Sequence, residues 1–450
     1  MESFTVESKT KNQNIHDELK RLDDSRLRER HTRLSAAYKE FASQNLALDL
    51  SRGKPGAEQL DLSSEMMDCL SRNDYKSRDG IDCRNYGGVD GIPEAKELFA
   101  GILEARPNEI MIGGNSSLAM MHDLVARGML RGLPGSELPW QKLPAVKFIC
   151  PSPGYDRHYS ICDYFGIEMI TVDYHEDGPD MSHVENLVAS DSSIKGIWCV
   201  PKYSNPTGIT YSDEVVERLA AMPAKASDFR IFWDNAYAVH HLSETPDRLM
   251  NILEACRRSG NPDRAFVFSS TSKITFAGGG VAMMASSETN INWLKKQTII
   301  QTIGPDKLNQ LRHVRFFKDM AGIEAHMKRH AAIVKPKFDL VLDILDSHLG
   351  GKGIASWSRP RGGYFISLNT QPGFARRVVG MAAAAGVTLT EAGATFPHGK
   401  DPADRNIRIA ATYPPLSELK PAMIVLALCI ELTAIEHELS ARGYKHPVEA

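Results

Sequence analysis

Short, nearly continuous apolar segments alternate with helix-like segments between about residues 95 and 290 of this chain. The apolar segments lie at 109–112, 145–150, 168–172, 194–200, 230–233 and 265–269, and the helix-like segments between them include 118–130, 213–221 and 248–258. Strands that are apolar at nearly every position are buried on both faces, and their alternation with helices is typical of a largely parallel sheet covered by helices on both sides. We therefore predict an α/β fold whose chemistry lies beyond the carboxyl ends of the strands.

The chain beyond about residue 310 follows a different pattern. A long, charged helical stretch at 311–349 leads into a hairpin-like segment at 357–368, and a helix, a strand and a last helix at 416–442 follow. Before the sheet, residues 17–41 have the imperfect spacing of one amphipathic helix. These patterns predict a smaller α+β domain beside the large one. The predicted division is an N-terminal arm and helix at 1–50 that contributes to the small domain, a large domain at 51–315 and a small C-terminal domain at 316–450.

The charge of the 450-residue chain is nearly balanced, since 53 Lys and Arg residues against 56 Asp and Glu residues give a net charge of −3. This balance argues against a protein that coats nucleic acid. The seven cysteines include no C-x-x-C pair, which favours a reducing compartment and a packing role. The first 33 residues lack the apolar core of a signal peptide, and apolar runs such as 422–430 are too short to span a membrane. We therefore expect a cytoplasmic protein with neither a membrane nor a nucleic acid as partner.

Two catalytic or phosphate-binding motifs are incomplete. The segment S-T-S-K at 270–273 fits the S-x-x-K pattern of serine acyl enzymes, but no S-D-N or K-T-G segment follows it. The segment at 393–400 imitates a phosphate-binding P-loop, but its spacer has five residues instead of four and Asp401 follows the lysine. The histidines give a metal site little support, and we predict none.

A second set of polar residues follows the predicted strands in order. Asn205, Asp234 and Lys273 each come at or after the end of one of three successive strands. Arg408 stands inside an apolar strand of the small domain, where a buried arginine needs an anion as its partner. Each residue alone has an ordinary explanation, as a turn residue, a helix cap, a solvated charge or one half of an internal ion pair. Together they form an ordered set, which carries more information than any one of them.

With this set, the chain resembles the fold-type I, pyridoxal-phosphate-dependent aminotransferases of the aspartate aminotransferase superfamily, from about residue 48 to 440. The segments S-R-G-K-P-G, N-Y-G-G, G-G-N-S-S and S-K-I-T-F-A-G-G-G most resemble a divergent subgroup of aspartate aminotransferases, some of which carry MocR-type labels. The resemblance implies a large domain with a mostly parallel, seven-stranded sheet sandwiched by helices, and a smaller α+β domain. It also implies that the large domain binds pyridoxal 5′-phosphate (PLP).

The resemblance gives the central roles to residues with the required chemistry. Lys273 is expected to form a Schiff base with the cofactor aldehyde and to move a proton as general base. Asp234 is expected to keep the pyridine nitrogen protonated, while Asn205 and Tyr237 hydrogen-bond the phenolic oxygen. Arg408 is expected to hold the α-carboxylate of the substrate through two parallel hydrogen bonds, with Asn205 as a further substrate contact.

The same resemblance matches residues upstream of this set to the cofactor. Four polar residues are expected at the phosphate, namely Asn115, Ser116, Ser117 and Ser270. Tyr155 is matched to an aromatic residue that stacks on the cofactor ring, and His158 to a residue that supports Asp234 from behind. Tyr86 is matched to a tyrosine that reaches the phosphate of the neighbouring subunit, which implies a homodimer with active sites shared across the interface.

One position departs from the family pattern. Relatives place an arginine eight residues after the Schiff-base lysine to pair with the phosphate, and Val281 stands there in this chain. Gly53 and Lys307 are expected among the substrate-binding residues. Lys307 lies where some relatives use a cation from the other subunit against a substrate side-chain carboxylate, and it could serve either the phosphate or an acidic substrate. Arg52 is a second candidate for the residue that recognises the substrate side chain.

The sequence thus predicts a dimeric aminotransferase that acts on amino acids and 2-oxo acids. The leading reaction carries the amino group of L-aspartate to 2-oxoglutarate by a ping-pong mechanism through the Lys273 Schiff base. Three alternatives stay open. Another PLP-dependent transaminase or a C–S lyase would keep the cofactor and change the reaction, a non-catalytic PLP-sensing protein would bind without turnover, and a serine acyl enzyme would use Ser270.

Overall fold

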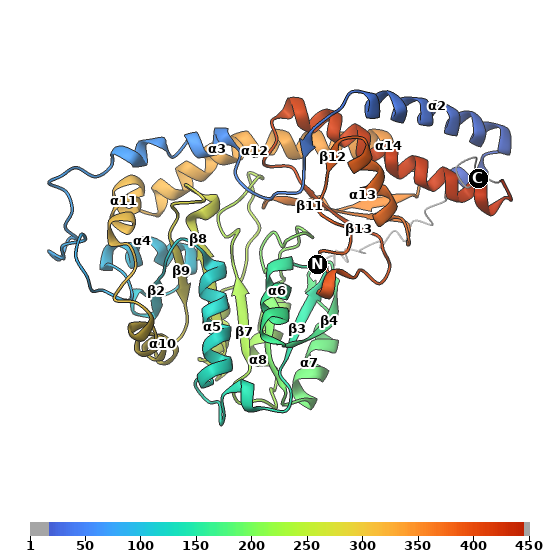
Figure 1. The fold of residues 1–450 in the computed structure, drawn as a ribbon. Helices are drawn as coiled ribbons and strands as arrows, with labels where there is room; N and C mark the ends of the chain where they lie inside the picture. Colours follow the sequence, from blue (N-terminus) through green and yellow to red (C-terminus); the bar gives the residue numbers. More distant parts are fainter. Residues whose placement is uncertain (1–17, 445–450) are drawn as a thin grey trace, which may run out of the picture.

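The predicted apolar segments form six strands of the largest sheet, in a computed structural model that describes residues 18–444 (Figure 1). Its strands lie in the order β2-β9-β8-β7-β6-β3-β4-β5. Their bounds are β2 Ile110–Ile112, β3 Lys147–Ser152, β4 Glu168–His175, β5 Gly178–Pro179, β6 Ile194–Cys199, β7 Arg230–Asp234, β8 Ala265–Ser270 and β9 Ala282–Ala285. The pairs from β8 through β7, β6 and β3 to β4 are parallel, whereas β9 and β5 run antiparallel to their neighbours. The α/β class is confirmed.

The described part of this sheet has eight strands, one more than the seven expected. The two-residue strand β5 folds back against the end of β4, where Gly178 pairs with His175. A strand of two residues leaves no apolar run in the sequence, so the pattern does not reveal it. The pattern also does not reveal β9, whose short segment A-M-M-A follows directly on a glycine-rich stretch.

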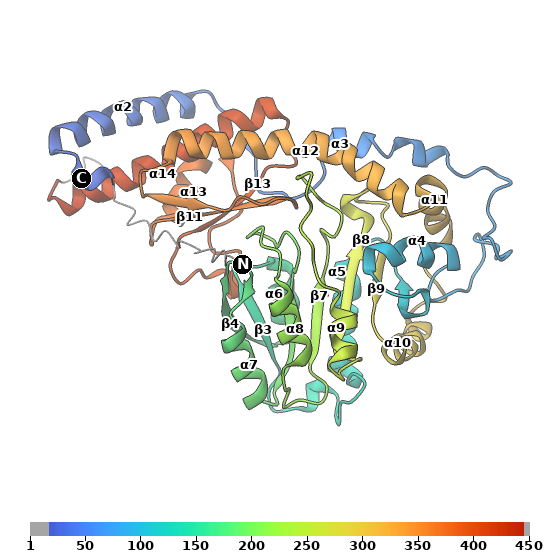
Figure 2. The same ribbon diagram turned by 180° about the vertical axis from the view of Figure 1, so that it is seen from behind.

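Helices cover both faces of the large sheet, because successive residues of a strand point to opposite sides. In β7, Ile231 and Trp233 pack into one buried cluster, whereas Phe232 packs into another. Figure 1 shows α5 and α6 in front of the sheet. Figure 2 views the molecule from the opposite side and shows α8 and α9 on the other face. The helices around this sheet are α4 Pro93–Leu103, α5 Ser117–Arg131, α6 Asp156–Phe165, α7 Met181–Ser190, α8 Asp213–Ala221, α9 Ile252–Arg258, α10 Glu288–Gln301 and α11 Lys307–Phe317.

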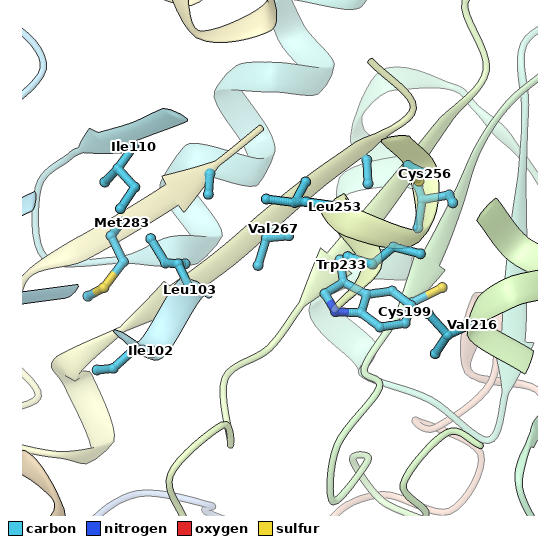
Figure 3. Packing of buried hydrophobic residues seen from close by; sticks show 14 of the residues in the cluster. Ile102, Leu103, Ile110, Cys199, Val216, Trp233, Leu253, Cys256, Val267 and Met283 are labelled. Carbon is cyan, nitrogen blue, oxygen red and sulfur yellow. The ribbon is translucent and has the colours of Figure 1, made fainter. Parts of the chain in front are cut away.

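The cluster that contains Trp233 is shown from close by in Figure 3. The indole of Trp233 lies beside Cys199 of β6 and Val216 of α8. Such large side chains hold neighbouring strands and the covering helix in one register, which fixes where the strand ends stand.

A second layer of helices and small sheets lies at one end of the large sheet (Figures 1 and 2). One small sheet is antiparallel, with β11 between β10 and β13, and the other pairs β1 with β12. The strands are β1 Leu48–Asp49, β10 Ala355–Trp357, β11 Phe365–Thr370, β12 Val387–Thr388 and β13 Asn406–Ala410. The helices of the N-terminal region and of this layer are α1 Glu18–Arg21, α2 Asp24–Ser43, α3 Ala57–Asp61, α12 Met320–Leu349, α13 Ala375–Ala384 and α14 Leu416–Ala441. The long helix α12 runs from α11 into this layer, where α2 lies alongside α14.

Two stretches predicted as single helices are each divided in two. The first breaks between α1 and α2, where Asp23 caps α2 by accepting a hydrogen bond from the backbone N–H of Arg26; residue 17 of the predicted range lies outside the described residues. The second breaks between α11 and α12, where Lys318 has a φ of 67° and Asp319 caps α12. Because the charged sequence keeps a helical periodicity on both sides of the capping residue, the periodicity alone does not reveal the break.

All seven cysteines are unpaired thiols, and six of them are buried, which confirms their packing role. Among residues 18–444, no helix combines the length and the apolar character that a membrane crossing requires.

The buried ring of Phe232 provides a test of the predicted core. The Phe232→Ala variant should lose about 3–5 kcal/mol of unfolding free energy, because the ring packs against Phe148, Trp198 and Phe268 and its removal leaves a cavity. Urea denaturation measures the loss. The Tyr164→Ala variant, at a side chain that is 75% exposed, should stay within about 0.5 kcal/mol of the parent. A loss below about 1 kcal/mol for Phe232→Ala would contradict the packing.

Candidate active site

A cavity of about 170 Å³ lies beyond the carboxyl ends of β6, β7 and β8. Parallel register places these three ends at one edge of the sheet, so residues that are far apart in the sequence meet there. Eight residues singled out from the sequence line the cavity, namely Ser116, Ser117, Tyr155, Asn205, Asp234, Tyr237, Ser270 and Lys273.

Asp234 is the last residue of β7, and its carboxylate is buried. One oxygen, Oδ2, lies 3.0 Å from Nε2 of His158, which stands behind it as expected. The ring of Trp198 stacks on His158 with a centroid distance of 4.4 Å. The second oxygen, Oδ1, is buried without a hydrogen-bond partner among the described residues. A buried, unpaired carboxylate oxygen is costly, so Oδ1 fits a protonated ring nitrogen of a bound group.

Lys273 ends the 3-10 turn Thr271–Lys273 that follows β8. Burial lowers the pKa of its amine, and the negative charge of Asp234 opposes that shift. Its Nζ lies 5.2 Å from the ring centroid of Tyr237, which also faces the cavity. Burial raises the pKa of the Tyr237 hydroxyl, so the phenol stays protonated and can donate a hydrogen bond. The cavity therefore contains an amine with a raised neutral fraction and a hydroxyl donor beside it.

The first turn of α5 and the turn after β8 also line the cavity. Ser116 caps α5 by accepting a hydrogen bond from the backbone N–H of Ala119, and free N–H groups of such a helix start suit an anion. Asn115 does not line the cavity, but its carbonyl accepts from the Ser272 hydroxyl at 2.8 Å. Ser272 itself lines the cavity and is a residue that the sequence analysis misses.

Val281, at the position of the arginine found in relatives, is buried against apolar side chains. Its backbone N–H donates to Oγ1 of Thr271 at 2.8 Å. Its side chain therefore offers no charge to the cavity, whose lining at this point includes the hydroxyls of Ser116, Ser117, Ser270 and Ser272.

Arg408 of β13 lies next to this cavity, with a side chain that is 8% exposed. Its Nη1 donates to Oδ1 of Asp156 at 2.9 Å and lies 3.4 Å from Oδ1 of Asn205. The partner anion that a buried arginine requires is thus an internal one, Asp156. Asp156 directly follows Tyr155 in the chain, but no sequence signal marks it as the partner of Arg408.

Gly53 supports Arg408 indirectly. A Cβ at position 53 would stand 2.1 Å from Cζ of Phe365, so the backbone at Gly53 lies directly against that ring. The ring of Phe365 in turn lies 5.0 Å from Cζ of Arg408. Gly53 therefore fixes the platform beneath the guanidinium and does not enter the cavity.

Three other candidates lie outside the cavity in this chain. Tyr86 is 82% exposed. Lys307 is buried, and its Nζ donates to the carbonyl oxygens of Asn85 and Gly87 at 2.7 and 2.6 Å, so it anchors the loop that carries Tyr86. Arg52 is exposed and lies 3.5 Å from Asp49.

A buried histidine network supports Lys273 from behind. The Lys273 carbonyl accepts from the Tyr364 hydroxyl at 3.3 Å, and Tyr364 accepts from the amide of Gln59 at 3.0 Å. The Gln59 amide also donates to Nδ1 of His330 at 3.1 Å, and Nε2 of His330 lies 3.1 Å from Nε2 of His326.

This pair, His326 and His330, has the H-x-x-x-H spacing that can bind a metal, a signal that the sequence analysis misses. Among the described residues, no group of three or more His, Cys, Asp or Glu side chains could hold a metal ion. Burial lowers the pKa of His330 to about 3 and also lowers that of His326, so the pair is a neutral structural element.

Comparisons with known proteins identify the family and the fold. A family model described as aspartate amino-transferase matches residues 22–442. An aspartate aminotransferase of Corynebacterium glutamicum is 46% identical over 419 residues, which cover 93% of this chain and 97% of that protein. A crystal structure of an aspartate transaminase from Corynebacterium glutamicum superimposes with a TM-score of 0.90 at 46% identity, over 93% of this chain and 99% of that one. The α-aminoadipate aminotransferase LysN of Thermus thermophilus shares the fold, with a TM-score of 0.69 at 18% identity over 86% of this chain and 93% of that one.

The buried histidine pair predicts a loss of stability in acid. The pKa of His330 is about 3 in the folded chain and near 6.5 when unfolded, so below pH 6.5 the unfolded chain binds a proton that the folded chain does not. Stability should therefore fall as the pH falls from 7 to 5, with about 2 kcal/mol of the fall due to His330. Urea denaturation at both pH values should show this part of the fall removed in His330→Gln and kept in His348→Gln, an exposed site on the same helix. An unchanged pH dependence in His330→Gln would contradict the account.

Proposed function

The chain belongs to the aspartate amino-transferase family and is an aminotransferase, and from that premise we propose that it transfers the amino group of L-aspartate to 2-oxoglutarate with PLP as its cofactor. The observation that carries the proposal is the placement of Lys273, Asp234 and Asn205 around one cavity, with a carboxylate oxygen of Asp234 left without a partner among the described residues. The name of the Corynebacterium relative supports aspartate as the amino donor.

The residues around the cavity fit PLP. When bound, PLP supplies an aldehyde that accepts an amino group and a ring that stabilises the electron pair left at the substrate α-carbon. Asp234 would accept a hydrogen bond from the ring nitrogen through Oδ1, while His158 holds Oδ2. Tyr155, which lines the cavity, would stack on the ring. The phosphate would accept hydrogen bonds from the start of α5 and from nearby hydroxyls, namely those of Ser116, Ser117, Ser270 and the segment at Asn115.

Lys273 would provide both the attachment point of the cofactor and the proton carrier. Because burial lowers the pKa of its amine, a larger fraction is neutral near pH 7 than for an exposed lysine. A neutral amine can attack an aldehyde and can accept a proton from the substrate α-carbon. The amides and hydroxyls beside it, from Asn205 and Tyr237, would donate to the phenolic oxygen of the ring and hold it in place.

Arg408 would bind the α-carboxylate of the substrate. Its Cζ lies 5.0 Å from the ring centroid of Phe365, and Oδ1 of Asn205, which lines the cavity, lies 3.4 Å from Nη1. A planar fork of N–H groups matches a carboxylate better than an ammonium group does. Gly53 would leave room for the Phe365 ring that packs against the guanidinium. Lys307 would contribute indirectly, by holding the loop that carries Tyr86.

We also propose that the enzyme is a homodimer. The exposed ring of Tyr86 is one of several large apolar side chains at the surface, together with Met67, Ile299, Ile300 and Ile303. Exposed apolar side chains of this size are candidates for burial at a protein interface. In a dimer, Tyr86 would reach the phosphate site of the neighbouring subunit.

The unpaired thiols support the proposed cytoplasmic location.

The lysine assignment can be tested by covalent trapping. Borohydride reduction of the holoprotein should attach a pyridoxyl group to the peptide that carries Lys273, as seen by mass spectrometry. The Lys273→Ala variant should carry no such label and should lose at least about 10⁴-fold in kcat, because both attachment and proton transfer are removed. Lys400→Ala, an exposed lysine in the P-loop-like segment, should behave as the parent. A label on another lysine in the parent would contradict the assignment.

The reaction can be tested by adding one substrate at a time. L-aspartate alone should yield about one equivalent of oxaloacetate per subunit and then stop, since the amino group stays on the cofactor until an oxo acid arrives. Addition of 2-oxoglutarate should restart turnover and produce glutamate. No oxaloacetate from aspartate, with product from another amino acid, would favour a different transaminase. Continuous pyruvate and ammonia from a sulfur amino acid would favour a C–S lyase.

A further inference from the structure

Asp156 forms an ion pair with the arginine proposed to bind the substrate. Its Oδ1 accepts from Nη1 of Arg408 at 2.9 Å. The other side of the guanidinium is occupied by Thr390, whose Oγ1 accepts from Nε at 3.4 Å and from Nη2 at 3.3 Å. Among the described residues, Asp156 is therefore the charged partner of Arg408, and its hydrogen bond is the shortest that the guanidinium makes.

The two partners of this pair differ in burial. The side chain of Arg408 is 8% exposed, whereas that of Asp156 is 31% exposed. A guanidinium this far from water requires a carboxylate partner, because an unpaired buried charge is costly. A carboxylate that is one-third exposed returns to water at much lower cost. If the pair opens, Asp156 is therefore the member that can leave.

The pair also joins two layers of the molecule. Asp156 is the first residue of α6, which covers the large sheet, and Arg408 lies in β13 of the three-stranded sheet. The same turn of α6 carries His158, which holds Asp234, and it follows directly on Tyr155. A carboxylate that approaches Arg408 thus meets the pair where these two layers touch.

Resting on the proposed role of Arg408, we propose that Asp156 is an internal competitor of the substrate carboxylate. In the free site it takes the Nη1 position that a carboxylate needs for two parallel hydrogen bonds. An incoming carboxylate displaces it toward water, and Asp156 takes the position back when product leaves. Asp156 thereby lowers the affinity for every ligand that binds Arg408, by the same factor for amino acids and oxo acids.

Ligand affinity of the holoenzyme tests this role. The Asp156→Asn variant keeps the side-chain shape and an oxygen acceptor but removes the charge. Titration calorimetry with maleate, a dicarboxylate, and with propionate, a monocarboxylate, should show both binding about fivefold more tightly than to the parent. Asp163→Asn, on the same helix and paired with His398 at 3.0 Å, is the matched control and should leave both affinities unchanged.

Three results would overturn the proposal. Unchanged affinities in Asp156→Asn would exclude competition, and weaker binding of both ligands would show that Asp156 positions Arg408 instead. Tighter binding of maleate alone would place the effect of Asp156 at the second carboxylate. Melting temperatures of the variants report whether the fold is kept.

The Arg408→Lys variant separates this proposal from the proposed function. If Arg408→Lys weakens propionate binding while Asp156→Asn does not strengthen it, the competition is wrong and the role of Arg408 stands. If Arg408→Lys binds propionate as the parent does, the role of Arg408 fails, and the competition fails with it. Arg405→Lys, an exposed arginine at the start of the same strand region, is the control for this substitution.

Discussion

The half-paired carboxylate of Asp234 is the constraint on which the rest of the site depends. Burying a carboxylate costs several kcal/mol unless hydrogen bonds or a positive charge compensate it. His158 provides one contact, at 3.0 Å, and Trp198 holds the imidazole in place by stacking on it. Oδ1 is buried without a hydrogen-bond partner among the described residues. Oδ1 therefore requires a hydrogen-bond donor from a bound group, and a protonated pyridine nitrogen would be such a donor.

The parallel sheet supplies the geometry that this demand requires. Asp234 ends β7, with β6 and β8 on either side, so Asn205 and Lys273 emerge next to it from neighbouring strand ends. The second layer contributes two aromatic residues that contact the site. The Tyr364 hydroxyl donates a hydrogen bond to the Lys273 carbonyl, and the Phe365 ring packs against the guanidinium of Arg408. The lysine proposed for covalent chemistry and the arginine proposed to bind the substrate therefore come from different layers, which meet beside the cavity.

Much of the large sheet can be predicted from the sequence, because strands buried on both faces leave apolar runs. The predicted segments 168–172 and 230–233 differ from β4 and β7 only at their ends. The two-residue strand β5 and the helix break at Lys318 leave no such signal, since pairing and capping depend on contacts outside the local sequence.

The site divides in the same way. Residues at strand ends, such as Asp234 and Lys273, can be predicted because their place in the sheet fixes their neighbours. Asp156 cannot be identified as the partner of Arg408 from sequence, because the two residues lie 252 positions apart and come from different layers. The burial of Lys307 on two carbonyl oxygens is equally a tertiary feature.

The most direct test of this account is the protonation state of the cofactor ring, measured as the ¹⁵N chemical shift of its pyridine nitrogen in the reconstituted protein. The account predicts a protonated nitrogen from pH 6 to pH 9, and loss of that protonation in Asp234→Asn. A nitrogen that is unprotonated at neutral pH in the parent protein, or that is unaffected by Asp234→Asn, would contradict it.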